Sequence, residues 1–286
     1  MSNNGELNLV DLQKKPLEEK EQEIIRLKEQ LHVLSFQKRE YFIEPHTKDG
    51  TLKFALMGDT HLGSLYERMD ALQSFFGVCK KEGVKDVFHT GDIYAGWKVY
   101  KGQEFELYAQ GYGEQRKAFE EKFPKLPGAK IHFILGNHDA SIQKLVGKIL
   151  GRDLEQMRSD FHYMGEDYAE VILQTKKGRS FRIALVHPCG SGAYAVSYRV
   201  QKYIESLPGG NKPHLLAMGH FHKSEFLPDY RNVAGFQTGT FESQTSLMKR
   251  YGSAAHVGGW IVEVVPQENL AHRIRAEWFG YYEPQK

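Results

Sequence analysis

The chain has 286 residues with a formal net charge of +2, and 41% of its residues are hydrophobic. A chain of this size can fold without disulfides or a structural metal, and its balanced charge excludes nucleic-acid binding through bulk charge alone. No apolar run is long enough to cross a membrane, and the polar N-terminus lacks the pattern of a secretory signal. Only two cysteines are present, Cys79 and Cys189, so we expect a reducing, cytoplasmic location.

Residues 1–50 are expected to form a disordered start and an N-terminal helical arm. Residues 1–15 are polar and show no periodicity. Helix-favouring residues follow, and apolar side chains recur at a spacing close to that of a heptad: Leu17, Ile24, Leu27, Leu31 and Leu34. This stripe must pack against the rest of the chain or against the same helix of a second subunit. The near-regular spacing favours the second arrangement, a homodimer.

Residues 51–286 are expected to form one α/β domain. Short apolar runs alternate with helical stretches in its first half, and strand follows strand in its second half. A turn at 176–179 predicts a hairpin. The predicted strands are 52–57, 86–89, 130–135, 168–174, 180–187, 214–218, 259–265 and 272–278, and the predicted helices are 69–81, 104–123 and 193–207.

Metal-ligand residue types stand where five of these strands end. The strand-end residues are Asp59 and His61, Asp92, the run Asn137, His138 and Asp139, His187, and the pair His220 and His222. The carboxyl ends of strands form the crevice where α/β sheets bind ligands, so these side chains are expected to meet there. Carboxylate and imidazole together suit Mn, Fe, Zn, Ni or Co better than Ca or Mg. Asp92, the lone acid of its segment, is a carboxylate that could bridge two cations.

The ordered set D-x-H, GD, GNHD, a lone H and GH-x-H resembles the calcineurin-like metallophosphoesterase family, over residues 52–225 by motif. The resemblance implies a four-layer αββα sandwich of two mixed β-sheets, with residues 51–286 as the metallophosphoesterase domain. It also implies two divalent transition-metal ions, for which we favour manganese. Asp59, His61 and His222 would hold one ion, Asn137, His187 and His220 the other, and Asp92 would bridge them.

The same resemblance implies a mechanism. A hydroxide between the metals would be the nucleophile, and His138 would protonate the leaving oxygen as general acid, oriented by Asp139. The segment Asp59 to Gly63 is similar to the opening of the DNA break-repair nuclease branch. That branch usually has a second acid soon after its GD, and the residues from Ile93 to Gly96 supply none.

We therefore expect a phosphodiesterase or nuclease acting on DNA, RNA or a nucleotide. The alternatives are a phosphomonoesterase acting on a small molecule or phosphoprotein, and a catalytically inactive assembly subunit. Two nearby features have open roles. The aromatic stretch from Tyr94 to Tyr112 could stack a base or belong to the core, and the turn Gly190 to Gly192 could bind phosphate or be an ordinary loop.

Overall fold

The computed structural model describes residues 19, 40–43, 50–147, 149–174, 180–266 and 272–282. The chain divides into two compact units, 1–37 and 38–286, and all described residues except Glu19, which is helical, belong to the second. Apart from Glu19, the predicted N-terminal helix and its possible dimer contact lie outside the described residues. The turn predicted at 176–179 also lies outside them. No helix of the described part is long and apolar enough to span a membrane.

Two six-stranded mixed sheets form the second unit. One has the order β1-β6-β7-β8-β10-β9 and the other the order β12-β11-β2-β3-β4-β5. The first contains β1 (Glu40–Ile43), β6 (Tyr168–Gln174), β7 (Ser180–Val186), β8 (Leu215–Met218), β9 (Ser224–Tyr230) and β10 (Val233–Thr238). The second contains β2 (Leu52–Met57), β3 (Asp86–His89), β4 (Lys130–Ile134), β5 (Phe161–Gly165), β11 (Gly258–Pro266) and β12 (His272–Gly280).

The central strands are apolar on both faces because both faces are covered. In β2, Phe54 and Leu56 point into the core between the sheets, whereas Ala55 and Met57 belong to the core beneath the helices. This alternation follows from the two-residue period of a strand. On the other sheet, Ala184 and Leu216 face a third, smaller core.

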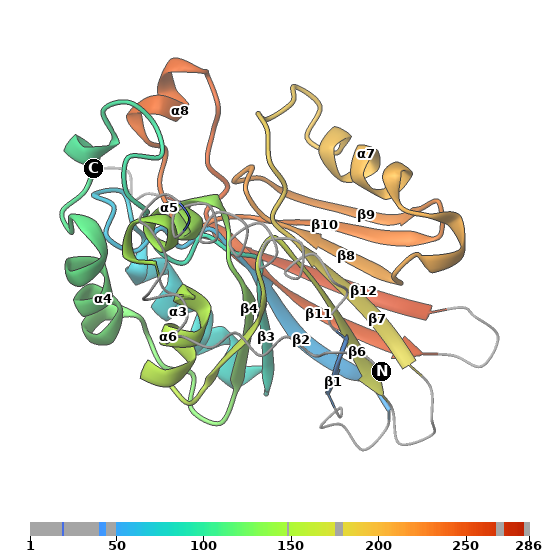
Figure 1. Ribbon diagram of the computed structural model, residues 1–286. Coiled ribbons are helices and arrows are strands. Elements are labelled where there is room, and N and C mark those ends of the chain that lie inside the picture. Colours follow the sequence, from blue (N-terminus) through green and yellow to red (C-terminus); the bar gives the residue numbers. More distant parts are fainter. Residues whose placement is uncertain are drawn as a thin grey trace. The chain divides into compact units, whose positions relative to one another are not determined.

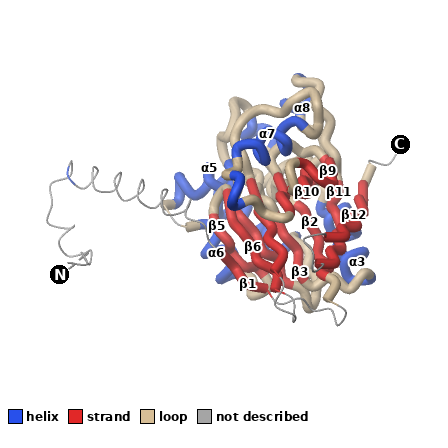
Figure 2. Tube along the Cα trace, turned by 90° about the vertical axis from the view of Figure 1, so that its right-hand side faces the viewer, coloured by secondary structure: helices blue, strands red, loops and turns tan. Residues whose placement is uncertain are grey.

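Helices cover the two outer faces. The helices α3 (Met69–Lys81), α4 (Gly111–Lys122), α5 (Asn137–Val146) and α6 (Leu150–Met157) supply the core on the side of β2, β3 and β4, and α7 (Tyr198–Ser206) covers β8 and β10 (Figure 1). The view turned by 90° shows strands gathered in the middle and helices outside them (Figure 2). The predicted four-layer αββα architecture is confirmed.

Several predicted boundaries were wrong. The helix predicted over 104–123 is a 3-10 turn, η1 (Gln103–Glu106), followed by α4, because Gly111 adopts a left-handed φ of 70° where the helix starts. The helix predicted from 193 begins only at Tyr198. Sequence patterns missed β1, β5, β9, β10, α6 and the short α8 (Ser246–Arg250). Because β1 pairs in parallel with β6, the folded unit begins before residue 50.

Candidate metal centre

All nine predicted site residues lie directly after strands, at one end of the two sheets. The second sheet supplies the segments that follow β2, β3 and β4, and the first sheet supplies those that follow β7 and β8. Backbone hydrogen bonds join two of these segments, from Asp59 N to Gly91 O and from His61 N to Asp92 O. The structure therefore brings together side chains that are distant in sequence.

Five of the predicted ligands have a left-handed backbone. Their φ angles are 51° for Asp59, 43° for His61, 55° for Asp92, 78° for His220 and 55° for His222. Such conformations cost about 1–3 kcal/mol for residues with a side chain, and they concentrate at functional sites. The chain accepts this strain at the positions where the side chains must turn toward one another.

Glycines make room for these side chains. A Cβ on Gly136 would lie 2.2 Å from Asp92 Oδ1 and 2.6 Å from His187 Cε1. A Cβ on Gly91 would lie 2.8 Å from His187 Nδ1. The glycines that precede the ligands in the motifs are thus required by close approach of the backbone, as well as by turn geometry.

The ligand atoms form two clusters, and the Asp92 carboxylate of the second lies close to the first. In the first, His61 Nε2 lies 2.9 Å from His222 Nε2, and Asp59 Oδ1 lies 3.9 Å and 3.7 Å from these two atoms. In the second, His187 Nε2 lies 3.2 Å from Asp92 Oδ2, and His220 completes the group.

The remaining contacts link the two clusters. Asn137 Oδ1 lies 3.0 Å from His187 Nε2, which places the amide in the second cluster. Asp92 Oδ2 is also 3.8 Å from His61 Nε2, so it faces both clusters. Donor groups of this type, at these separations, fit divalent transition-metal ions.

Backbone carbonyls orient several of the imidazoles. His187 Nδ1 lies 2.7 Å from Thr90 O, and His220 Nε2 lies 2.7 Å from Gly190 O. Such partners fix which ring nitrogen carries the proton and leave the other free for a metal. The amide of His220 also donates to both oxygens of Asp59, at 3.0 Å each.

Burial and neighbouring charges shift the pKa values of the site residues in opposite directions. Burial raises the pKa of Asp59 well above its usual range, and the neighbouring Asp92 charge adds to this. Burial also acts to raise the pKa of Asp92, but the charges of His187 and His138 hold it well below its usual range. For His187, burial acts to lower the pKa, yet Asp92 and Asp59 raise it to about 10. Burial lowers the pKa of His222 to about 3. A divalent cation would offset the two buried carboxylates.

His138 lies beside the first cluster, with its ring 4.4 Å from that of His61. Its Nδ1 lies 2.6 Å from Ala95 O, which leaves Nε2 as the free nitrogen. His138 also forms a candidate ligand group with His61 and Asp92, so its role as an acid rather than a ligand stays a prediction.

Asp139 has other partners than the predicted one. Its carboxylate accepts hydrogen bonds from the amides of Ile93, Tyr94 and Gly136, at 3.1, 2.9 and 3.0 Å. In the structure the Ala95 carbonyl, rather than Asp139, contacts the imidazole of His138. Asp139 instead ties the segments after β3 and β4 together.

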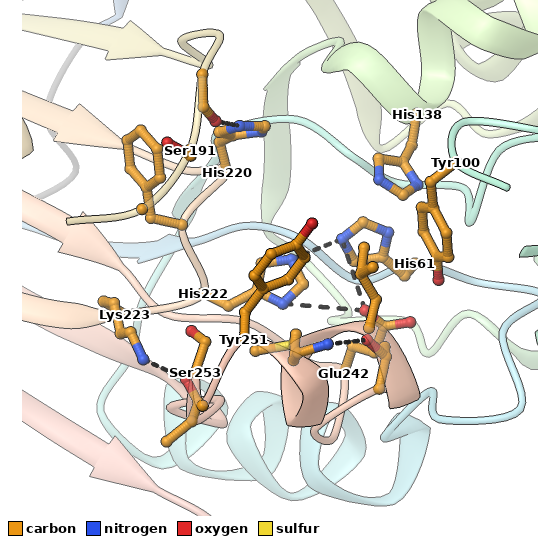
Figure 3. A pocket seen from close by; sticks show the side chains of 18 of the residues that line it. His61, Tyr100, His138, Ser191, His220, His222, Lys223, Glu242, Tyr251 and Ser253 are labelled. Carbon is orange, nitrogen blue, oxygen red and sulfur yellow. Dashed lines mark hydrogen bonds and ion pairs between the residues drawn. The ribbon is translucent and has the colours of Figure 1, made fainter. Parts of the chain in front are cut away.

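A cavity of about 980 Å³ opens over the clusters (Figure 3). Arg199, Glu242 and Tyr251 are among the lining residues that sequence reasoning missed. The Arg199 guanidinium lies 5.4 Å from the ring centre of Phe221, and its Nε has no hydrogen-bond partner. Tyr251 is 80% exposed.

The aromatic stretch from Tyr94 to Tyr112 is divided between two environments, since Tyr94 is in the core and Tyr100 lines the cavity. The loop from Gly190 to Gly192 also lines it.

Comparison with known proteins agrees with this geometry. Residues 52–224 match the model of the calcineurin-like phosphoesterases. The DNA polymerase II small subunit of Halobacterium salinarum is 36% identical over 100 residues, which cover 34% of this chain and 20% of that protein. The corresponding subunit of Methanothermobacter thermautotrophicus is 25% identical over 245 residues, covering 71% of this chain and 50% of that protein. The chain thus spans half or less of the length of these curated relatives.

Among solved structures, GAP50, the anchor in the inner membrane complex of Plasmodium, matches with a TM-score of 0.49 and 12% identity. That match covers 80% of this chain and 84% of the other.

Proposed function

Because the chain belongs to the calcineurin-like phosphoesterase family, we propose that it hydrolyses phosphodiester bonds with two divalent transition-metal ions, manganese being favoured. One observation carries this proposal. Asp92 faces both ligand clusters, with Oδ2 3.2 Å from His187 Nε2 and 3.8 Å from His61 Nε2. A carboxylate shared in this way is what a pair of neighbouring cations requires.

The seven proposed ligands divide as the clusters divide. Asp59, His61 and His222 would hold one ion and Asn137, His187 and His220 the other, with Asp92 available to both. When bound, such a pair of cations supplies Lewis acidity at phosphorus and lowers the pKa of an attacking water. His138 lines the same cavity, and its Nε2 is the ring nitrogen available to give a proton to the leaving oxygen.

A nucleic acid or nucleotide is the substrate class that we favour. The named relatives are DNA polymerase subunits. The cavity has the chemistry for such a ligand, with Arg199 able to pair with a phosphate and the exposed Tyr251 able to stack on a base. The free thiols of Cys79 and Cys189 support the expected cytoplasmic location.

The test compares a bis-aryl phosphate with a mono-aryl phosphate, each with manganese added. We expect faster turnover of the diester than of the monoester. A second screen should then show activity on single-stranded or duplex DNA, RNA or cyclic nucleotides. Faster turnover of the monoester would instead favour a phosphomonoesterase and overturn the diesterase assignment.

A second candidate is a non-catalytic subunit of a larger assembly. The relatives, which are small subunits of a DNA polymerase, favour it. It predicts that the chain binds metals yet hydrolyses none of the substrates above. The presence of all the proposed ligands together favours the enzyme.

A further inference from the structure

Glu242 is a buried acid in the metal centre that belongs to none of the family motifs read from the sequence. It follows β10, and its side chain is 7% exposed. Its Oε2 lies 3.9 Å from His222 Nδ1 and 4.0 Å from His61 Nε2 (Figure 3). It therefore adds a second carboxyl group, besides Asp59, beside the two imidazoles of the first cluster.

His222 differs from its neighbours in the partner of its second ring nitrogen. His187, His220 and His138 each place one nitrogen 2.6–2.7 Å from a backbone carbonyl. The Nδ1 of His222 is buried and has no hydrogen-bond partner. Its Nε2 faces Asp59 and His61, where the first ion is proposed to bind. The Glu242 carboxyl group is the acidic group nearest to Nδ1 that the described contacts include.

The segment that carries Glu242 is hydrogen-bonded to the backbone of Asp59, a proposed metal ligand. Phe241 N donates to Asp59 O at 3.0 Å, and the Thr240 hydroxyl donates to the same oxygen at 2.7 Å. The amide of Glu242 donates to that hydroxyl oxygen at 3.0 Å. The backbone of Glu242 is thus held at a fixed place relative to Asp59. Its carboxyl group is hydrogen-bonded to Ser64, and rotation about its side-chain torsions can still bring an oxygen toward His222.

We propose that Glu242 is a positioning residue of the first metal, acting through His222. Its carboxylate accepts the Nδ1–H of His222, which fixes the tautomer and leaves Nε2 as the metal ligand. The hydrogen bond needs a closure of about 1 Å from the present separation, within reach of a carboxylate on two rotatable bonds. This inference rests on the proposed metal-dependent function, since it requires that His222 be a ligand.

The test measures manganese affinity by titration calorimetry and metal content by elemental analysis. Glu242→Ala should weaken binding of one ion by roughly 10–100-fold, the usual cost of losing such a partner. Glu242→Gln retains an oxygen acceptor and should keep most of the affinity. Glu242→Leu, of similar volume, repeats the loss if the alanine variant fails to fold. Glu106→Gln removes a carboxylate from the same cavity, one that bonds to Tyr100, and should leave manganese affinity unchanged.

Cobalt substitution separates positioning from direct ligation. The absorption spectrum of the cobalt-loaded protein should be the same in Glu242→Gln as in the unsubstituted chain, because the ligands are the same. A change in cobalt coordination would show that Glu242 is itself a ligand and overturn the positioning role. Unchanged affinity in both Glu242→Ala and Glu242→Leu would overturn it as well. If the unsubstituted chain binds no metal, the proposed function fails and this inference fails with it.

Discussion

The Nε2 atoms of His61 and His222 lie 2.9 Å apart, although the residues are 161 positions apart in sequence. Burial lowers the pKa of both rings, so both are neutral at neutral pH. Two neutral imidazoles can meet at their Nε2 atoms in two ways. Either one Nε2 carries a proton and donates a hydrogen bond to the other, or both give their lone pairs to one cation. With Asp59 beside them, a shared cation fits this relationship.

Asp92→Asn should remove at least one metal and nearly all turnover. The substitution keeps the shape of the side chain but deletes the charge that faces both clusters. Two cations held close together would then repel with less compensation. Elemental analysis measures the outcome, and two metals per chain in an active Asp92→Asn protein would rule out the bridging role.

His138→Ala should leave the metal content intact and lower kcat by roughly 10²–10⁴-fold, the usual worth of general acid catalysis. The loss should shrink for aryl phosphodiesters with good leaving groups, because these need little protonation. An equal loss across leaving groups would exclude the acid role. Loss of a metal ion would instead place His138 among the ligands, with His61 and Asp92.

Gly136→Ala should disable the site while leaving the fold in place. The added Cβ would lie 2.2 Å from Asp92 Oδ1, so the carboxylate must move. A displacement of about 1 Å at a reacting site can cost on the order of 10²-fold in rate. Gly113→Ala is the matched control, because nothing lies within 4 Å of its added Cβ and it is in helix α4. Normal activity in Gly136→Ala would mean that Asp92 tolerates movement and is not held as proposed.

The metal-free protein should lose thermal stability as pH rises above about 6.5. His187 has its pKa raised to about 10 in the folded state, so its stabilising charge is complete below its unfolded pKa and is lost as pH rises toward 10. Glu242, with its pKa raised by burial to about 8, acts in the same direction, because its ionisation is disfavoured in the folded state.

Unfolding scans in chelator at pH 6.5 and pH 9 measure this effect. We expect a fall of a few degrees, since about 1 kcal/mol shifts Tm by roughly 2–4 °C at this size. Added manganese should reduce the fall, because a cation compensates the buried carboxylates. A stability that rises with pH in chelator would contradict the charge states assigned to the site.

The sequence predicted those parts of the site in which a metal-ligand residue type directly follows an apolar strand. Apolar runs followed by Gly-Asp, Gly-Asn-His or Gly-His located four strand ends, and the lone His187 located a fifth. The structure places all five at the same end of the two sheets. The pairing of two separate sheets could not be read from those runs, because it depends on long-range register.

Glu242 was missed because its strand was missed. In the hairpin of β9 and β10, Pro228 and polar residues interrupt the first strand, which is an edge strand. Gly235 interrupts the second, where a Cβ would lie 2.4 Å from Val200 of α7. Close packing of β10 against α7 therefore requires glycine at position 235, and a glycine weakens the sequence pattern that predicts a strand. Without β10, the acid that follows it was not recognised as a strand-end residue.

Removing residues 1–37 should test the N-terminal helix without disturbing the metal centre. The cut leaves β1 in place to pair with β6, and every proposed ligand lies at or after Asp59. An isolated helix of this length is marginal in water, so the stripe from Leu17 to Leu34 must be buried somewhere. If it pairs with a second copy, light scattering should show a dimer for the whole chain and a monomer after truncation, with diester hydrolysis retained. A whole chain that is already monomeric would exclude the dimer, and insoluble truncated protein would indicate that the stripe packs on its own chain.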